Sequence, residues 1–136
     1  MLRKNAKVDL ISRAPLFSEL SKKELGEVAS IADEIDLPAG RALTTQGERG
    51  REFFVIVEGS VKVEKNGRKV NELHAGDFFG EVALLTDATR NATVTATAPL
   101  RVLVVTDTAF KSLTRRMPSI APKLLAPLAE RIDDNL

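Results

Sequence analysis

The sequence has no cysteine, no tryptophan, no tyrosine and a single histidine among its 136 residues. Without cysteine no disulfide can form within the chain, which suits a reducing compartment. A zinc site built from cysteine and histidine ligands is also excluded. We therefore expect no metal site and no catalytic residue that depends on these side chains.

Excess charge of one sign and long apolar runs are absent as well. Twenty basic and 19 acidic residues leave a formal net charge of +1, so a basic footprint for direct nucleic-acid binding is not expected. No apolar run approaches the roughly 20 residues of a membrane-spanning helix. No apolar run follows the basic N-terminus either, so the sequence predicts no signal peptide and a cytoplasmic location.

The composition is that of a soluble globular protein, with 43% hydrophobic and 29% charged residues. A chain of this length fits one domain, which we expect to span residues 1–136. Such a domain buries about two-thirds of the surface that the unfolded chain exposes. The sequence is therefore long enough to form a real core.

Helical signals occupy the first part of the chain, about residues 8–33. Val8–Arg13 is a short amphipathic stretch that stops before Pro15. Ser21 and Glu24 have the spacing of a capping box, in which each side chain bonds the other residue's backbone. The apolar residues behind it recur at helical spacing: Leu25, Val28, Ala29 and Ala32. We expect this helix to run to about Asp33, with Asp33 and Glu34 at its exposed end.

Strand signals follow, over about residues 34–106. Glu52–Glu58 is short and apolar on both faces, as in a buried strand. Asn66-Gly67 is a strong hairpin signal between two alternating stretches. Residues 92–98 and 100–106 are two more candidate strands, and turns are expected at residues 38–40, 47–50 and 75–77. About eight short strands separated by frequent turns favour an antiparallel barrel or sandwich.

The last part, about residues 107–136, returns to helical spacing. Asp107 or Thr108 is the expected cap of a helix that carries Phe110, Leu113 and Met117 on one face. Ser119 is the expected cap of a final helix, which Pro127 should kink or split. Its apolar face consists of Ile120, Leu124, Leu128 and Ile132, and Asp133-Asp134 is read as its exposed end.

The stretch FFGEVALLTDATRNATVTATA, residues 78–98, carries the functional signal. Gly80-Glu81 ends a strand, and residues 82–85 can form one helical turn whose free N–H groups suit a phosphate. Arg90 lies on the following loop and can present its guanidinium fork to the same phosphate. Glu81 would repel a phosphate but can accept a hydrogen bond from a nearby hydroxyl. A ribose fused to a cyclic phosphate combines both groups.

Residues 79–94 resemble the phosphate-binding cassette of the cyclic nucleotide-binding domain family. That cassette reads Phe-Gly-Glu-apolar-Ala-Leu, then a short loop, then Arg-x-Ala-Thr/Ser-Val. The matching residues are Phe79, Gly80, Glu81, Ala83, Leu84, Arg90, Ala92, Thr93 and Val94. The resemblance extends from about Leu16 to the end of the chain. It implies a mainly β fold: an eight-stranded antiparallel β-roll, a jelly-roll-like double-stranded β-helix, with helices at both ends.

The resemblance also assigns roles within the cassette. Glu81 would bind the ribose 2′-hydroxyl, and Arg90 would bind the cyclic phosphate. The full set of candidate ligand-binding residues is Gly80, Glu81, Val82, Ala83, Leu84, Arg90, Asn91, Ala92 and Thr93. Asn91 departs from the family, which often has Ala here in cAMP-preferring and Thr in cGMP-preferring members, so the base preference stays open. Leu124, Leu125 or Leu128 would supply an aliphatic lid over the base.

The resemblance implies a non-catalytic sensor whose regulatory ligand is cAMP, with cGMP second, and which needs no cofactor. Its C-terminal helices would transmit occupancy to an unidentified effector domain or protein, and a homodimer is compatible with the sequence. Two alternatives remain. One is a degenerate β-roll that has lost the nucleotide and serves interaction or dimerisation. The other is a barrel enzyme of the cupin kind, which the single histidine disfavours.

Overall fold

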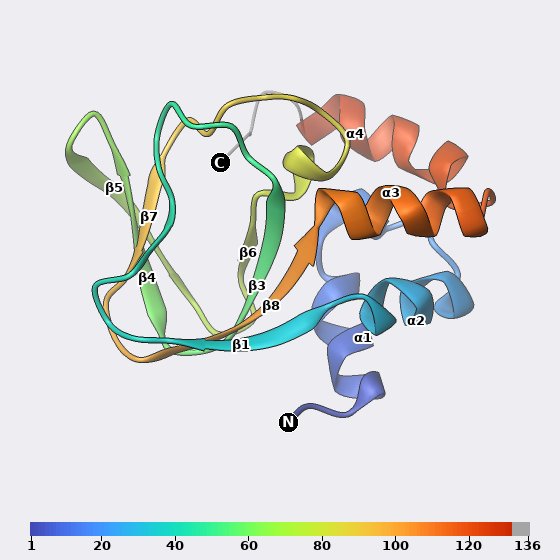
Figure 1. Cartoon of the computed structure of the whole chain (residues 1–136), viewed down its shortest axis with the longest axis horizontal. Coiled ribbons are helices and arrows are strands. Elements are labelled where there is room, and N and C mark those ends of the chain that lie inside the picture. The colour runs from blue at the N-terminus through green and yellow to red at the C-terminus, as the bar shows by residue number, and fades with distance from the viewer. Residues whose placement is uncertain (132–136) are drawn as a thin grey trace.

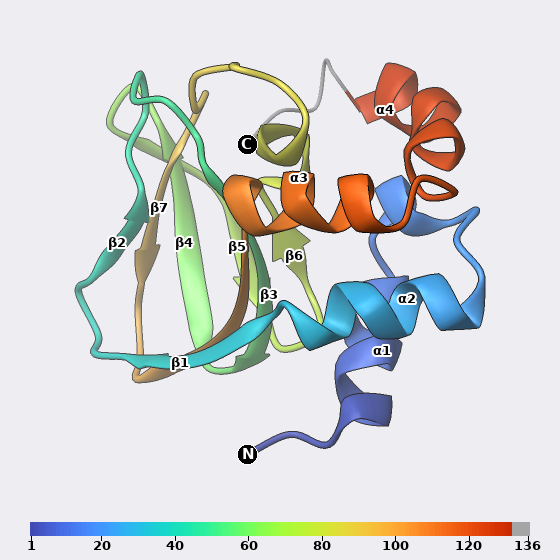
Figure 2. The same ribbon diagram turned by 45° about the vertical axis from the view of Figure 1, so that its right-hand side comes forward.

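The computed structural model describes residues 1–131, in which eight strands form two four-stranded antiparallel sheets with helices at one end. Figure 1 shows the roll on the left and the helices gathered on the right, and the turned view of Figure 2 preserves this division. One sheet has the order β1-β8-β3-β6 and the other β2-β7-β4-β5. This is the eight-stranded β-roll with flanking helices that the sequence predicts.

The strands follow one another closely along the chain. Their bounds are β1 Asp33–Leu37, β2 Ala42–Thr44, β3 Glu52–Glu58, β4 Ser60–Lys65, β5 Arg68–His74, β6 Phe78–Phe79, β7 Thr93–Ala96 and β8 Leu100–Thr106. The helical elements are α1 Lys4–Ser12, η1 Pro15–Phe17, α2 Lys22–Ser30, η2 Glu81–Leu84, α3 Asp107–Arg116, η3 Ala121–Leu124 and α4 Leu125–Arg131.

Strand β3 separates two hydrophobic cores because successive side chains of a strand point to opposite faces. Phe53 and Val55 belong to the cluster that packs against the helices. Phe54 and Ile56 belong to the cluster that fills the roll between the two sheets. The run is therefore apolar throughout, and the prediction of a buried strand at 52–58 is confirmed.

The predicted capping box and hairpin are both confirmed. Ser21 accepts from the backbone of Glu24 while the Glu24 carboxylate accepts from the backbone of Ser21, so α2 starts where the sequence indicates. Asn66 and Gly67 both have positive φ, of 53° and 79°, and join β4 to β5. Two left-handed residues match the right-handed twist of the strands that they connect.

The end of α2 is a correction to the sequence prediction. The helix stops at Ser30, and Asp33–Leu37 forms β1, an edge strand paired antiparallel with β8. Asp33 and Glu34 are therefore strand residues and not a helix end. Glu34 also accepts a hydrogen bond of 2.7 Å from the Leu2 backbone, which ties the N-terminus to this strand.

The C-terminal helices differ from the prediction in their caps. Thr106, instead of Asp107 or Thr108, caps α3 by accepting a hydrogen bond from the Ala109 backbone. The expected final helix is divided into η3 and α4, and Pro127 lies in the first turn of α4, where a proline is tolerated. The side chain of Ser119 donates to Glu24 and does not cap this segment. Ile132 and Asp133-Asp134 lie outside the described residues.

None of the helices within residues 1–131 combines the length and the apolar character needed to cross a membrane.

Candidate functional site

The predicted cassette forms a short 3-10 turn between β6 and the loop that leads into β7. This turn, η2, covers Glu81–Leu84, and all four of its residues are buried. It starts at Gly80, whose φ of 84° is unfavourable for residues with a side chain. The expected helical turn after Gly80 is confirmed, and so is the candidate strand at residues 92–98, within which β7 runs from Thr93 to Ala96.

Two glycines make room for the guanidinium of Arg90. A Cβ atom at Gly80 would lie 2.5 Å from Nη1 of Arg90, and a Cβ at Gly50 would lie 2.7 Å from Nε. Contacts this short between heavy atoms are not tolerated, so any larger residue at either position would displace the Arg90 side chain. Gly50 belongs to the loop before β3, for which the sequence predicts only a turn. It is a site residue that the prediction missed.

Arg90 is held in place by both its side chain and its backbone. Its Nη2 donates a hydrogen bond of 2.6 Å to the carbonyl of Glu52, and its backbone N–H donates to Glu48 at 2.7 Å. The residue is only 3% exposed. Burial lowers the pKa of Arg90, and the nearby charge of Glu52 opposes this effect. Because this lowering starts from the very high pKa of arginine, the guanidinium stays charged at neutral pH.

Glu81 is buried to the same degree as Arg90 and lies where the roll meets the N-terminal helices. Its Oε2 is 3.4 Å from the backbone nitrogen of Leu16, a long hydrogen bond that reaches η1 across 65 residues of sequence. Neither Glu81 nor Arg90 points into bulk solvent. Both predicted ligand-binding side chains are therefore ordered by contacts with elements outside the cassette.

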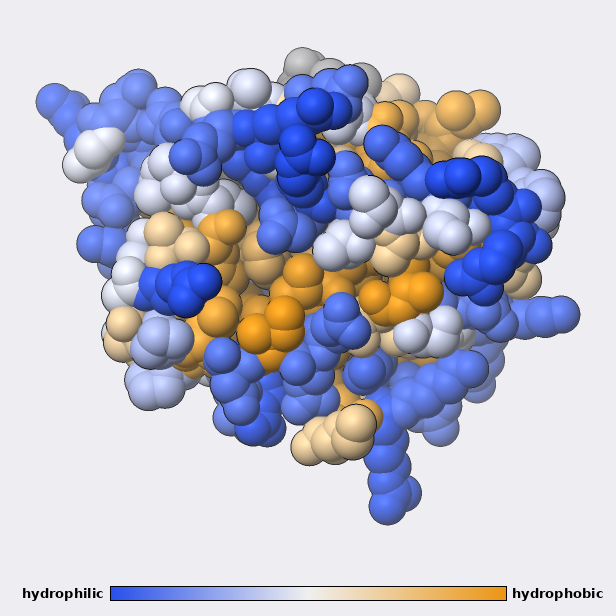
Figure 3. All heavy atoms as spheres, in the orientation of Figure 1, coloured by the Kyte–Doolittle hydropathy of each residue, from blue (hydrophilic) through white to orange (hydrophobic). Residues whose placement is uncertain are grey.

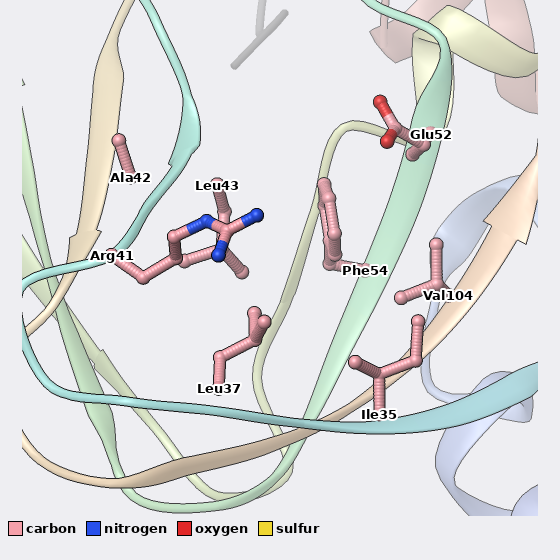
Figure 4. A pocket seen from close by; sticks show the side chains of 8 residues that line it. All are labelled: Ile35, Leu37, Arg41, Ala42, Leu43, Glu52, Phe54 and Val104. Atoms are coloured by element: carbon pink, nitrogen blue, oxygen red, sulfur yellow. The ribbon is translucent and has the colours of Figure 1, made fainter.

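A cavity of about 260 Å³ opens into the roll next to the Arg90 site. In Figure 4, Arg41 reaches into it from the β2 side, while the Glu52 carboxylate and the Phe54 ring come from β3. Its lining residues are Ile35, Leu37, Arg41, Ala42, Leu43, Glu52, Phe54 and Val104. Glu52 connects it to the cassette, because its carbonyl accepts from Arg90. Figure 3 shows apolar surface framed by hydrophilic residues at the centre of the face seen in Figure 1.

Asn91 stands out among the residues after Arg90. Its Oδ1 atom is buried and has no hydrogen-bond partner within the described residues. Its neighbours are satisfied: the carbonyl of Ala92 accepts from Thr44 at 3.1 Å, and Oγ1 of Thr93 accepts from the Gln46 backbone at 3.0 Å. A buried acceptor without a donor costs about 1–3 kcal/mol. A ligand that supplies a donor there would recover part of this cost.

The structure brings some of the predicted site residues together and separates others. Gly80 and Arg90 lie next to each other across the cassette, although ten positions apart in the sequence. The aliphatic lid that the resemblance implies is not formed in this conformation. Leu124 is fully buried among the helices and Leu128 packs against the same cluster, whereas Leu125 is 68% exposed. None of the three lines the cavity in this conformation.

Within the part of the chain that the structure describes, no three His, Cys, Asp or Glu side chains lie close enough together to hold a metal ion.

Comparison with known proteins identifies relatives of the whole roll. The family described as "Cyclic nucleotide-binding domain" matches residues 34–117. A cAMP-dependent protein kinase regulatory subunit from Mycosarcoma maydis is 42% identical over 108 residues, covering 73% of this chain and 21% of that protein. A cGMP-dependent protein kinase, egl-4, from Caenorhabditis briggsae is 36% identical over 120 residues, covering 83% of this chain and 16% of that protein.

A solved structure shares the fold. The N-terminal domain of a transcriptional regulator from Streptomyces coelicolor A3(2) superposes with a TM-score of 0.79 at 27% identity, covering 93% of this chain and 91% of that one. The chain spans about a fifth or less of the two kinase-related proteins, so it corresponds to one part of each. The family match covers more than half of the chain, and the fold superposes on that of the solved domain. The chain belongs to the cyclic nucleotide-binding domain family.

Proposed function

We propose that the chain is a non-catalytic sensor that binds cAMP or cGMP reversibly, with the cyclic phosphate at Arg90 and the ribose 2′-hydroxyl at Glu81. The observation that carries this proposal is the fixed guanidinium of Arg90. It lies between two glycines, is almost fully buried, and is oriented by the Glu52 carbonyl. A guanidinium that is positioned before binding loses little side-chain entropy when it pairs with a phosphate.

Glu81 supports the same ligand because it lies beside the glycine that contacts Arg90. A carboxylate and a guanidinium on neighbouring parts of one cassette suit a molecule with a hydroxyl next to an anionic diester. The hydrogen bond that Glu81 accepts from Leu16 is long, at 3.4 Å. A ribose hydroxyl can therefore compete with this long contact for the carboxylate.

Asn91 is the side chain that we propose contacts the base. Its buried Oδ1 is an acceptor without a donor in the described residues. Adenine and guanine both carry an exocyclic amino group, so either base can supply the missing donor. The family resemblance places cAMP ahead of cGMP, and an unpaired acceptor at Asn91 suits both bases.

The size of the ligand sets the expected affinity. A cyclic nucleotide has about 22 non-hydrogen atoms, and about −0.3 kcal/mol per atom gives about −7 kcal/mol. That value corresponds to a dissociation constant of about 10 µM. Thermal shift measurements with cAMP, cGMP, magnesium and zinc test the proposal. Stabilisation by a cyclic nucleotide alone supports it. A response to metal alone would revive the barrel enzyme, and no response to any addition would favour a degenerate interaction module.

We further propose that the segment after β8 passes ligand occupancy to an effector. The relatives in which this domain occurs are several times longer than this chain, so an effector domain or partner protein is expected elsewhere. A ligand shifts a conformation only if it binds the two states with different affinity. Slower amide hydrogen exchange over residues 107–131 on adding nucleotide would support the coupling. Unchanged exchange would leave a binding domain without a switch.

A further inference from the structure

One buried carboxylate joins the two ends of the chain. Glu24 is 2% exposed and lies at the start of α2. Its Oε1 accepts from the Ser21 backbone at 2.7 Å and pairs with Nζ of Lys123 at 2.6 Å. Its Oε2 accepts from the hydroxyl of Ser119, also at 2.6 Å. The two C-terminal partners are 95 and 99 residues away in the sequence.

The hydrogen bonds between Glu24 and the C-terminal residues are short. Ion-paired and charge-assisted hydrogen bonds are shorter and roughly twice as strong as neutral ones, and the two contacts to the C-terminal side both measure 2.6 Å. Removing one partner of a buried pair leaves the other charge uncompensated. Residues 119–131, here called the C-terminal segment, are therefore held against α2. Separating the segment from α2 costs free energy.

The C-terminal segment also packs on η1. Leu124 is buried in the helical core together with Leu16 and Phe17 of η1, and Leu128 packs against the same cluster. The backbone of Leu16 in turn donates to Glu81, the proposed ribose ligand. A continuous set of contacts therefore runs from Glu24 through the C-terminal segment and η1 to the nucleotide site.

In this conformation the C-terminal segment cannot serve as a lid. Its apolar side chains Leu124 and Leu128 face the helical core, and none of its residues lines the cavity in the roll. Ser119 and Lys123 hold its first part against α2. To cover a bound base, the segment has to leave these contacts.

We propose that Glu24 is a latch that holds the C-terminal segment away from the nucleotide site, and that releasing the latch raises nucleotide affinity. This inference rests on the proposed function and concerns the regulation of the same site. When only a fraction of molecules is in the binding-competent state, the apparent dissociation constant rises by the inverse of that fraction. Weakening the latch increases the fraction and so tightens binding.

Lys123→Met is the direct test, because methionine keeps much of the aliphatic stem and removes the ammonium group. Lys22→Met is the matched control: Lys22 is an exposed lysine on α2, and the partners of the Glu24 side chain are Ser21, Ser119 and Lys123 instead. Amide hydrogen exchange over residues 120–131 and titration calorimetry with cAMP and cGMP are measured on the full chain. We expect exchange to be at least about tenfold faster in Lys123→Met, and the dissociation constant to fall about threefold to thirtyfold.

Ser119→Ala provides a milder variant if Lys123→Met folds poorly, as judged by its circular dichroism. It removes one hydrogen bond and keeps the ion pair, so the same two changes should appear with smaller size. Unchanged exchange in both variants overturns the latch. Faster exchange with unchanged or weaker nucleotide binding overturns its link to affinity. If the parent protein binds no cyclic nucleotide, the proposed function and the affinity claim fail together, and the exchange result alone then decides whether Glu24 holds the segment.

Discussion

The carbonyl oxygen of Glu52 accepts a hydrogen bond of 2.6 Å from Nη2 of Arg90. This contact fastens the cassette loop to the first residue of β3, the strand that divides the two cores of the molecule. The guanidinium is thereby fixed by the fold itself before any ligand arrives. Glu52, which orients the guanidinium, also lines the neighbouring cavity. The cation of Arg90 therefore lies next to this cavity.

Replacing Arg90 by alanine should weaken cyclic nucleotide binding about tenfold to a few hundredfold. A hydrogen bond to a charged group contributes about 1.5–3 kcal/mol, and each 1.4 kcal/mol is a factor of ten in affinity. Isothermal titration calorimetry measures the change, with the exposed Arg116→Ala as the control. Equal affinity of Arg90→Ala and the parent would show that the phosphate binds elsewhere.

Gly80→Ala should damage both folding and binding. Its Cβ would lie 2.5 Å from Arg90 and 2.7 Å from the Glu52 carbonyl, and its φ of 84° adds strain of about 1–2 kcal/mol. Gly40→Ala is the matched control, because its φ is 89° but no atom lies within 4 Å of the added Cβ. We expect both variants to lose stability in urea unfolding and only Gly80→Ala to lose at least about tenfold in affinity. Similar affinity in the two variants would mean that the Gly80–Arg90 contact does not position the ligand.

Asn91→Ala should leave the free energy of unfolding within about 0.5 kcal/mol of the parent value or raise it. The substitution removes a buried acceptor that has no donor in the described residues. The comparison is Thr44→Val, at a buried residue whose hydroxyl donates to Ala92 and accepts from the Val94 backbone. That variant should lose about 1–3 kcal/mol. A loss above about 1 kcal/mol in Asn91→Ala would show that its side chain stabilises the fold on its own.

Stability should depend on pH through Glu24. Hydrogen bonds lower the pKa of Glu24 from 4.5 to about 2. The largest effect comes from Lys123, followed by Ser119 and Ser21. A carboxyl group whose pKa is lowered by folding stabilises the folded state at pH values above the pKa of the unfolded chain. That contribution is lost as the pH falls from about 4.5 towards 2. Glu24→Gln should therefore be less stable than the parent at pH 7, by about 1–3 kcal/mol.

The difference between the two proteins should shrink as the pH is lowered through the same window. Urea unfolding from pH 7 to pH 3 measures it. Other carboxyl groups with lowered pKa values, such as Glu34 and Asp36, are present in both proteins and cancel in the comparison. A difference that stays constant over this range would mean that the charge of Glu24 does not contribute.

Much of the roll could be predicted from the sequence because its signals are local. The buried strand at 52–58 is a continuous apolar run, and the hairpin at Asn66-Gly67 depends on two residues that accept positive φ. Strand β1 could not be predicted this way. Its sequence, DEIDL, has few apolar residues, and as an edge strand it owes its conformation to pairing with β8.

The candidate site was predictable within the cassette and not beyond it. Gly80, Glu81 and Arg90 belong to one contiguous motif, whereas Gly50 and Glu52 reach Arg90 only through the folding of another loop. The packing of the C-terminal segment could not be predicted for a similar reason. Helical spacing shows that Leu124 and Leu128 share a face, but not whether that face packs on the roll or on η1. Ser119 has the sequence position of a helix cap, but its hydroxyl donates to the distant Glu24.

The most direct test of the account is calorimetric titration of the full chain with cAMP, cGMP and the open 5′-AMP. The cassette is proposed to hold a cyclised ribose phosphate between Arg90 and Glu81. We expect at least one cyclic nucleotide to bind with a dissociation constant of about 10 µM or tighter and 5′-AMP to bind at least about tenfold more weakly. Absence of binding by both cyclic nucleotides at millimolar concentration, or equal binding of the open nucleotide, would contradict the account.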